Sequence, residues 1–211
     1  MKPACILFAW LLLAGFDESA VRWTYEDARV GQLPEGWSAA KTGEGPGSVW
    51  RIVEDDTAPE GPNVLAQTSA EGPRPLFNLC VLDEGTYGDV LITLSLKAVA
   101  GEIDQGGGPV WRYQDADHYY ICRHNPLENN FRIYKVIDGK RTQLATADSR
   151  AESGKWHTIT VAMRGDTIVC SINGKELEVR DDAITKAGKV GLWTKADAVT
   201  YFDDFHVRSA E

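Results

Sequence analysis

Apolar and polar residues alternate along most of the chain, which is typical of strands that bury one face. Between positions 89 and 97, Val90, Ile92 and Leu94 alternate with polar or exposed-type residues, and the same period recurs over 156–164. No window shows a sustained helical period, apart from a short turn expected near 181–184. Further strands are predicted at 49–54, 64–68, 76–82, 110–113, 119–124, 131–137, 141–145, 167–172, 175–180, 189–194 and 199–208.

The turn residues between these strands favour antiparallel pairing. Asn173-Gly174 and Asp138-Gly139 each separate two predicted strands, and such dipeptides are the strongest local indication of a hairpin. The three glycines at 106–108 precede no Gly-Lys-Ser/Thr, so they indicate close strand packing or a bulge and not a phosphate loop. The pattern as a whole predicts an all-β fold, a two-sheet antiparallel β-sandwich.

Composition excludes several classes of protein. The 211 residues are 43% hydrophobic and 25% charged, which is typical of a globular domain. The net charge is −9 and no basic block offsets it, so nucleic acid is not an expected partner.

The first residues resemble a secretory signal. Lys2 is followed by an uncharged apolar run over 3–16, too short for a membrane span, although a buried first element or a misplaced start codon would also explain it. We therefore expect a signal peptide over 1–20 and one β-sandwich domain over 21–211. The domain is then expected to be secreted or periplasmic, with no membrane span after signal removal.

Three cysteines remain after such a cleavage. Cys80, Cys122 and Cys170 each lie in an apolar segment, which favours buried unpaired thiols over one disulfide plus a free thiol.

Several short motifs occur in a recognisable order between Tyr87 and Val207. The motifs are Tyr87-Gly88-Asp89, residues 106–112, 154–158, 172–174, 188–193 and Tyr201-Phe202-Asp203-Asp204-Phe205, with 33–37 fitting the usual first-strand region. In this order the chain resembles the concanavalin A-like lectin/glucanase superfamily. More narrowly, it is similar to secreted bacterial 3-keto-disaccharide (3-keto-glycoside) hydrolases and to their laminin-G-like relatives. The resemblance implies a concanavalin A-like jelly roll.

The chain departs from the hydrolase pattern at two positions. Such enzymes carry Gly-Asn-Ser-Gly before the arginine and a glutamate in the next strand, whereas here the segment is Gly106-Gly107-Gly108 and 117–123 holds no Glu. Arg112 is the polar position that remains. These departures favour binding over turnover.

A stretch that mixes aromatic and polar residues is the main candidate for a ligand site. Sugars present apolar faces and many hydroxyls, so their sites combine aromatic rings with Asn, Asp, Arg and His side chains. The candidate substrate-binding residues are Trp111, Arg112, Tyr113, His118, Tyr120, Arg123, His124 and Asn125. The alternative is that the aromatic residues are core and the charged residues ordinary surface.

Three functions follow from these observations. The first is a secreted domain that binds an oligo- or polysaccharide in a shallow aromatic and polar groove. The second is a 3-keto-glycoside hydrolase or lyase, in which Arg112 would stabilise an enolate and Asp117, His118 or Glu102 would act as the base. The third is a laminin-G-like interaction module with a protein partner.

Two acidic positions raise other kinds of chemistry. Glu102 and Asp104 share a strand face, but the next position on that face is Gly106, so the second glutamate of a glucanase is missing and an ordinary solvated loop is expected. No cofactor is required for the functions above, although the resemblance implies structural calcium, for which Asp203 is the candidate ligand. A backbone or arginine partner, or a local bulge, would also account for Asp203.

Overall fold

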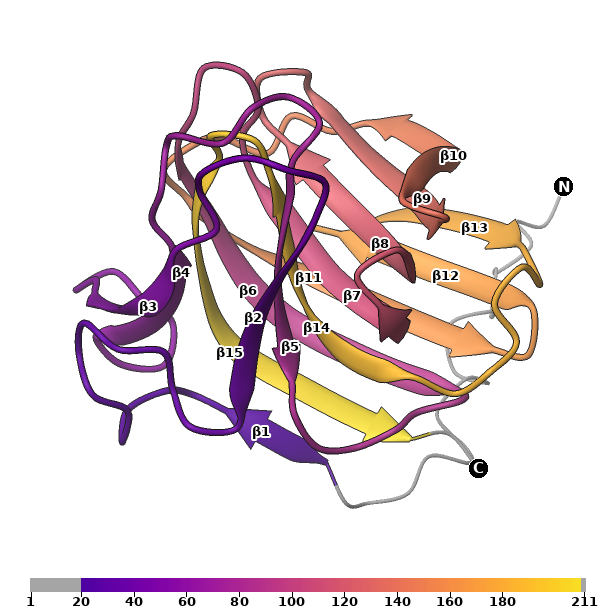
Figure 1. Cartoon of the computed structure of the whole chain (residues 1–211), viewed down its shortest axis with the longest axis horizontal. Coiled ribbons are helices and arrows are strands. Elements are labelled where there is room, and N and C mark those ends of the chain that lie inside the picture. The colour runs from indigo at the N-terminus through magenta and orange to yellow at the C-terminus, as the bar shows by residue number, and fades with distance from the viewer. Residues whose placement is uncertain (1–19, 210–211) are drawn as a thin grey trace, which may run out of the picture.

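The computed structural model describes residues 20–209, and these form two antiparallel sheets (Figure 1). The predicted signal peptide lies outside this range except for Ala20. The 8-stranded sheet has the order β13 (Lys175–Arg180), β12 (Thr167–Ile172), β11 (Trp156–Arg164), β6 (Val90–Ala100), β15 (Val199–Ser209), β4 (Asn63–Gln67) and β3 (Trp50–Glu54), with β1 (Val21–Trp23) beside β15. The 7-stranded sheet has the order β10 (Lys140–Asp148), β9 (Asn130–Ile137), β8 (His118–Asn125), β7 (Gly107–Asp115), β14 (Lys189–Lys195), β5 (Phe77–Leu82) and β2 (Trp37–Thr42).

The all-β prediction is confirmed, with differences in detail. Both predicted hairpins are present, because β9 pairs with β10 and β12 pairs with β13. The sequence did not predict β1 or β2 as strands. It did predict a short turn near 181–184, where the structure has no helical turn. Within the described range, no helix is long and apolar enough to cross a membrane.

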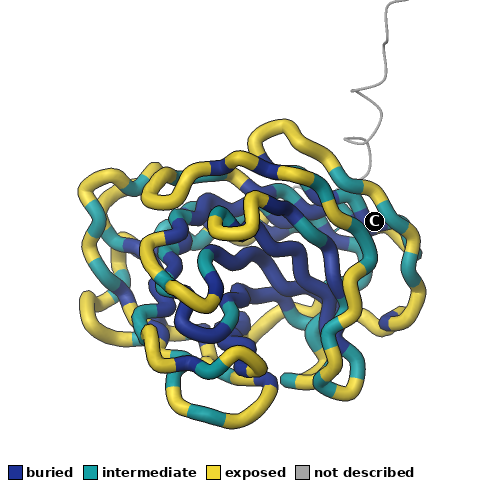
Figure 2. Tube along the Cα trace, turned by 90° about the horizontal axis from the view of Figure 1, so that it is seen from above, coloured by how far each residue is buried: buried dark blue, intermediate teal, exposed yellow. Residues whose placement is uncertain are grey.

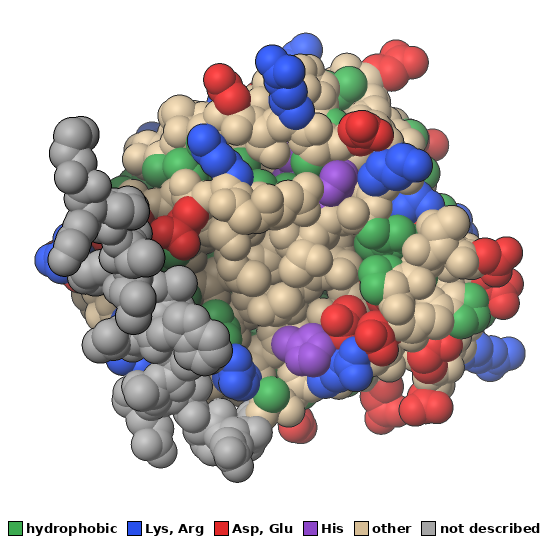
Figure 3. All heavy atoms as spheres, turned by 180° about the vertical axis from the view of Figure 1, so that it is seen from behind, with side chains coloured by type: hydrophobic (Ala, Val, Ile, Leu, Met, Phe, Trp, Pro, Cys, Tyr) green, Lys and Arg blue, Asp and Glu red, His purple; other side chains and the backbone are tan. Residues whose placement is uncertain are grey.

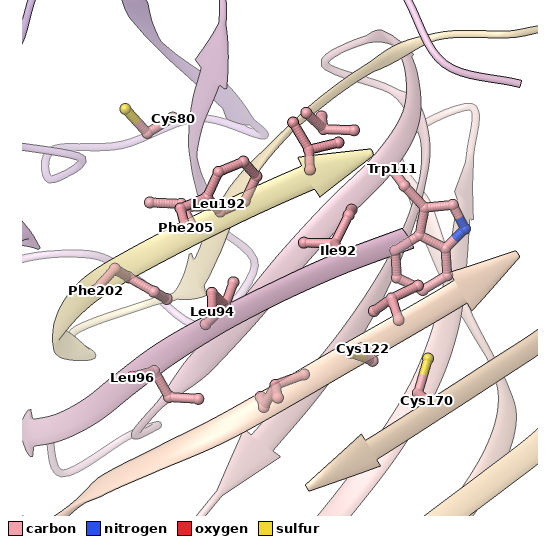
Figure 4. Packing of buried hydrophobic residues seen from close by; sticks show 14 of the residues in the cluster. Cys80, Ile92, Leu94, Leu96, Trp111, Cys122, Cys170, Leu192, Phe202 and Phe205 are labelled. Carbon is pink, nitrogen blue, oxygen red and sulfur yellow. The ribbon is translucent and has the colours of Figure 1, made fainter. Parts of the chain in front are cut away.

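The main core lies between the two sheets. Ile92, Leu94 and Leu96 of β6 point toward Trp111 and Cys122 of the facing sheet (Figure 4). Figure 2 shows buried residues along the interior strands and exposed residues in the surrounding loops. The three described cysteines are buried and free, as the sequence indicated.

The glycines at 107 and 108 allow close strand contact, as predicted. A Cβ on Gly107 would collide with the carbonyl oxygen of Trp193, and one on Gly108 would collide with that of Cys122. Only glycine therefore fits where β7 passes between β14 and β8.

The 7-stranded sheet is strongly curved, and its outer face is concave. In a flat sheet, four strand spacings would separate β2 from β8 by ~19 Å. Nevertheless the Thr42 hydroxyl on β2 lies 2.7 Å from the Tyr119 hydroxyl on β8. Likewise, Arg141 on β10 reaches a ring on β5, five spacings away. The two edges of the sheet therefore curl toward each other over its outer face.

Candidate functional site

The concave face carries a second buried cluster, separate from the core between the sheets. Its members are Phe77, Leu79, Val81, Val110, Tyr119, Ile121, Tyr134, Val136 and Trp193. The outer face of a sandwich sheet is ordinarily wet, but the curl of this sheet covers its middle. The guanidinium carbon of Arg141 lies 4.3 Å from the centre of the Tyr134 ring, 5.3 Å from Phe77 and 5.6 Å from Trp193. A cation therefore rests on three aromatic rings at the centre of the concave face.

An ion-pair network begins beside these rings, at a buried carboxylate. Asp104, in the loop between β6 and β7, has 1% of its surface exposed. It accepts hydrogen bonds from Lys195 Nζ at 2.8 Å and Asn125 Nδ2 at 2.8 Å, and from Arg123 Nη1 at 3.3 Å to each carboxylate oxygen. Two strands that are distant in sequence, β8 and β14, thus converge on one carboxylate.

The same network reaches solvent at Glu128. One oxygen of Glu128 accepts hydrogen bonds from Arg123 Nη2 at 2.8 Å, Asn130 Nδ2 at 2.9 Å and Arg132 Nη1 at 3.0 Å. Burial alone would raise the pKa of Glu128, but these bonds and the charge of Arg123 lower it to about 2. The side chains of Glu128 and Arg132 are 44% and 30% exposed, so this end of the network is open to a ligand.

The loop that presents Asp104 is itself fixed by a second carboxylate. Asp197 accepts hydrogen bonds from the backbone N–H groups of Glu102, Ile103 and Asp104 at 2.7–3.1 Å. Burial raises the pKa of Asp197, but these three donors outweigh it and the net shift is downward. The position of Asp104 is therefore set before any ligand arrives.

We define the concave site as Asp104, Arg123, Glu128, Arg132, Arg141 and Lys195. It combines charged donors with two carboxylate acceptors, which suit the hydroxyls of a ligand, while the rings beneath Arg141 are at most 7% exposed and hold that side chain in place. Over the described residues, no group of three His, Cys, Asp or Glu side chains is placed to hold a metal ion.

Two of the predicted aromatic ligands lie in the core, which corrects the expectation of an aromatic groove built on them. Trp111 and Tyr120 have 0% of their surface exposed and stack on each other between the sheets at 5.8 Å. The Trp111 indole N–H points at Met163 Sδ, 3.1 Å away, and the Tyr120 hydroxyl donates to Asp181 at 2.6 Å. The alternative that the sequence left open, that these rings are core, describes both residues.

Of the other predicted binding residues, Arg123 and Asn125 belong to the network of the concave site. His124 points the opposite way, between the sheets, where its ring meets His157 edge-on at 5.5 Å. Burial, with the charges of His157 and Arg123, lowers the pKa of His124 to about 4. Tyr113 is half-buried and stacks on Tyr119 at 6.1 Å, at the far end of the concave face.

The four candidate catalytic residues are not brought together. Arg112 is buried and donates to the carbonyl oxygens of Gly88, Ile184 and Gly165.

Asp117 and His118 lie at the turn between β7 and β8, whereas Glu102 is exposed beyond the opposite end of β7. The nine residues of β7 span ~27 Å when extended, so this length of strand separates Glu102 from the other two. The His118 ring makes hydrogen bonds to Asp115 at 2.8 Å and to Asp138 at 3.2 Å. The pKa of His118 is raised, mainly by the hydrogen bond to Asp115.

Asp203 is fully buried at a bulge in β15. Its carboxylate accepts hydrogen bonds from the backbone N–H groups of Glu60 at 2.9 Å and Asp204 at 2.7 Å. Burial raises its pKa to about 6 against the effect of these donors. The bulge and the backbone partners account for this residue, and calcium at Asp203 stays a prediction.

The sequence did not identify most of the concave site. Asp104 was expected to be an ordinary solvated charge, and Glu128, Arg132, Arg141 and Lys195 were not singled out. The signal that could have found part of it is the density of Arg, Asn and Glu over 123–132, at the junction of two predicted strands.

The opposite side of the molecule offers a different surface. The outer face of the 8-stranded sheet is mostly neutral, with charged side chains around it (Figure 3). A pocket of about 600 Å³ there is lined by Thr93 and His206 among others, and none of the described residues that line it is Trp, Tyr or Phe. The polar groups nearby pair with each other, as Thr160 does with Ser171 at 2.6 Å and His206 with Asp204 at 2.7 Å.

Together, the fold and the polar concave face define a lectin-type β-sandwich. The structure is similar to the carbohydrate binding module CBM66 from Bacillus subtilis, with a TM-score of 0.65 and 16% identity over 82% of this chain and 96% of that one. It is also similar to domain 4 of AbnA, a GH43 extracellular arabinanase from Geobacillus stearothermophilus solved in complex with arabinotriose. That TM-score is 0.57, with 10% identity over 90% of this chain and 91% of that one.

Residues 89–210 match the galactocerebrosidase C-terminal lectin domain, and the chain belongs to that family. Galactocerebrosidase of Danio rerio is 31% identical over 110 residues, which are 52% of this chain and 16% of that protein. The chain thus spans a small part of that relative. The lectin-type resemblance is confirmed, while the narrower resemblance to 3-keto-disaccharide hydrolases stays a prediction.

Proposed function

We propose that this chain is a carbohydrate-binding module that holds a glycan against the concave face of the 7-stranded sheet. One observation carries the proposal: a network of charged donors and acceptors, fixed from beneath by Asp104, opens to solvent at Glu128 and Arg132 beside aromatic rings. Family membership and the likeness to CBM66 support this function. In line with the apolar N-terminal run, the module would be secreted from the cell or act in the periplasm.

Fixed polar groups suit sugar recognition because they lose little freedom on binding. Arg123 is held by two carboxylates, and Glu128 is held by Arg123, Asn130 and Arg132. Arg123 is 1% exposed and fixes Glu128 from below, so sugar hydroxyls would meet Glu128 and Arg132 already in place at the surface.

The test is a glycan array followed by calorimetry with the tightest-binding oligosaccharide. Because hydrogen bonds to charged groups contribute ~1.5–3 kcal/mol, Arg132→Ala should weaken binding by about tenfold or more. Arg51→Ala makes the same charge change on an exposed position of the other sheet, and should leave affinity within about twofold. Equal affinity in the parent protein, Arg132→Ala and Arg51→Ala would contradict the proposal, and so would the absence of binding to any glycan.

The 3-keto-glycoside hydrolase and the laminin-G-like interaction module remain alternatives. The hydrolase would need Arg112 to turn from three backbone carbonyls toward a substrate. Mass spectrometry of a 3-keto-disaccharide incubated with the protein tests it, because release of the two monosaccharide parts would establish turnover.

A further inference from the structure

The charges of the concave site do not balance. Arg123, Arg132, Arg141 and Lys195 stand against Asp104 and Glu128, so the linked side chains carry two excess positive charges. Two further carboxylates lie nearby, Asp148 opposite Asn130 and Asp197 against the Asp104 backbone, so the excess belongs to the linked side chains and not to the whole face.

Arg141 is the source of the imbalance. Arg123, Arg132 and Lys195 each have a carboxylate partner, whereas Arg141 has no ion pair or hydrogen bond with any described residue, and its Nη1 is buried without an acceptor. Its contacts are the faces of Tyr134, Phe77 and Trp193. Burial lowers its pKa, as expected for a cation that lacks a counter-ion.

A buried guanidinium N–H without an acceptor, such as that of Arg141 Nη1, is costly unless something pairs with it. The three rings hold the group in place, and Glu128 and Asp104 are already occupied by Arg123, Arg132 and Lys195. The rest of the guanidinium is partly exposed, so a partner for it would come from outside the described chain. A planar carboxylate matches the fork of a guanidinium better than a single hydroxyl does.

We propose that the concave site selects acidic glycans, with the carboxylate of a uronic acid residue pairing with Arg141. This inference rests on the proposed function and adds the class of sugar. In the bound state the uronate carboxylate would pair with the exposed part of the Arg141 guanidinium, while the sugar hydroxyls meet Glu128 and Arg132.

The test uses matched pairs of sugars. Galacturonate, glucuronate and mannuronate oligosaccharides are each compared with the same oligosaccharide after reduction of its carboxylates to hydroxymethyl groups. We expect at least one uronate to bind about tenfold or more tightly than its reduced form at low salt, and the difference to shrink as salt is added. A sulfated galactose oligosaccharide is tested beside these pairs, to compare a sulfate group with a carboxylate.

The variant that isolates the charge is Arg141→Met, because a methionine side chain can still cover the rings. It should lower uronate affinity about tenfold more than it lowers the affinity for the reduced form, so that the preference for the uronate is lost. Arg51→Met is the matched control on the opposite sheet and should change neither affinity. Intact folding of each variant is checked by circular dichroism and thermal unfolding.

The outcomes separate this inference from the proposed function. Equal binding of uronate and reduced sugars, still sensitive to Arg132→Ala, would overturn the acidic-glycan inference and leave the carbohydrate-binding module standing. Tighter binding of the sulfated sugar than of every uronate would overturn the carboxylate assignment. Absence of binding to any of the sugars, neutral or acidic, would overturn both.

Discussion

Replacement of Asp104 by asparagine should destabilise the fold strongly, although the residue lies in a loop. Asp104 is the shared partner of Arg123, Lys195 and Asn125, and both it and Arg123 are 1% exposed. Removal of one partner of a buried ion pair typically costs ~3–5 kcal/mol, because the remaining charge is left without compensation. Arg123 keeps Glu128, so the lower end, ~3 kcal/mol, is expected for Asp104→Asn.

The assay is urea unfolding followed by the fluorescence of the seven tryptophans, with a thermal scan beside it. A loss of ~3 kcal/mol corresponds to a drop of ~6–12 °C in Tm for a domain of this size. Glu102→Gln is the matched control, two residues away in the same loop, and its exposed side chain should change stability by no more than ~0.5 kcal/mol. A loss below ~1 kcal/mol in Asp104→Asn would refute the claim that this carboxylate anchors the network.

Three further predictions follow from the burial of particular groups. Trp111→Ala should lower the free energy of unfolding in urea by ~3–5 kcal/mol, as for other large core side chains. A variant of unchanged stability would contradict the burial of Trp111. Cys80, Cys122 and Cys170 should stay unreactive toward a thiol reagent until the protein unfolds, so rapid labelling of the native state would contradict their placement. The pKa of Asp203 is about 6 in the fold against a usual 3.8, so its folded form holds the proton more tightly and stability should fall as pH rises from about 4 to about 6. Asp203→Asn removes that loss, and its stability relative to the parent should rise by ~2–3 kcal/mol between pH 4 and pH 7.5; a difference independent of pH would exclude the titration.

The strands and turns could be predicted from the sequence because their determinants are local. Alternation over 89–97 and the Asn173-Gly174 turn involve residues that are close in the chain, and the structure confirms both. β2 was missed because its segment, Trp37–Thr42, holds mainly small and polar residues, and it is a strand only through pairing with β5.

The site could not be predicted in the same way, because it depends on the curvature of the sheet. Arg141 meets Phe77 and Trp193 only where strands four and five positions away in the sheet curl over it. Alternation gave no indication of which face was concave, and the bulge at Arg112, with its positive φ, puts Trp111 in the core but Tyr113 on the concave face. The preference for Trp111 and Tyr120 as ligands therefore could not be resolved against their role in the core.

The central claim, that glycan binds on the concave face, is tested most directly by hydrogen–deuterium exchange with and without a bound oligosaccharide. We predict slower exchange in peptides that cover 123–134 and 193–195, and no change over 91–97 and 156–164 on the other sheet. Protection confined to 91–97 and 156–164 would place the ligand on the 8-stranded sheet and contradict the account.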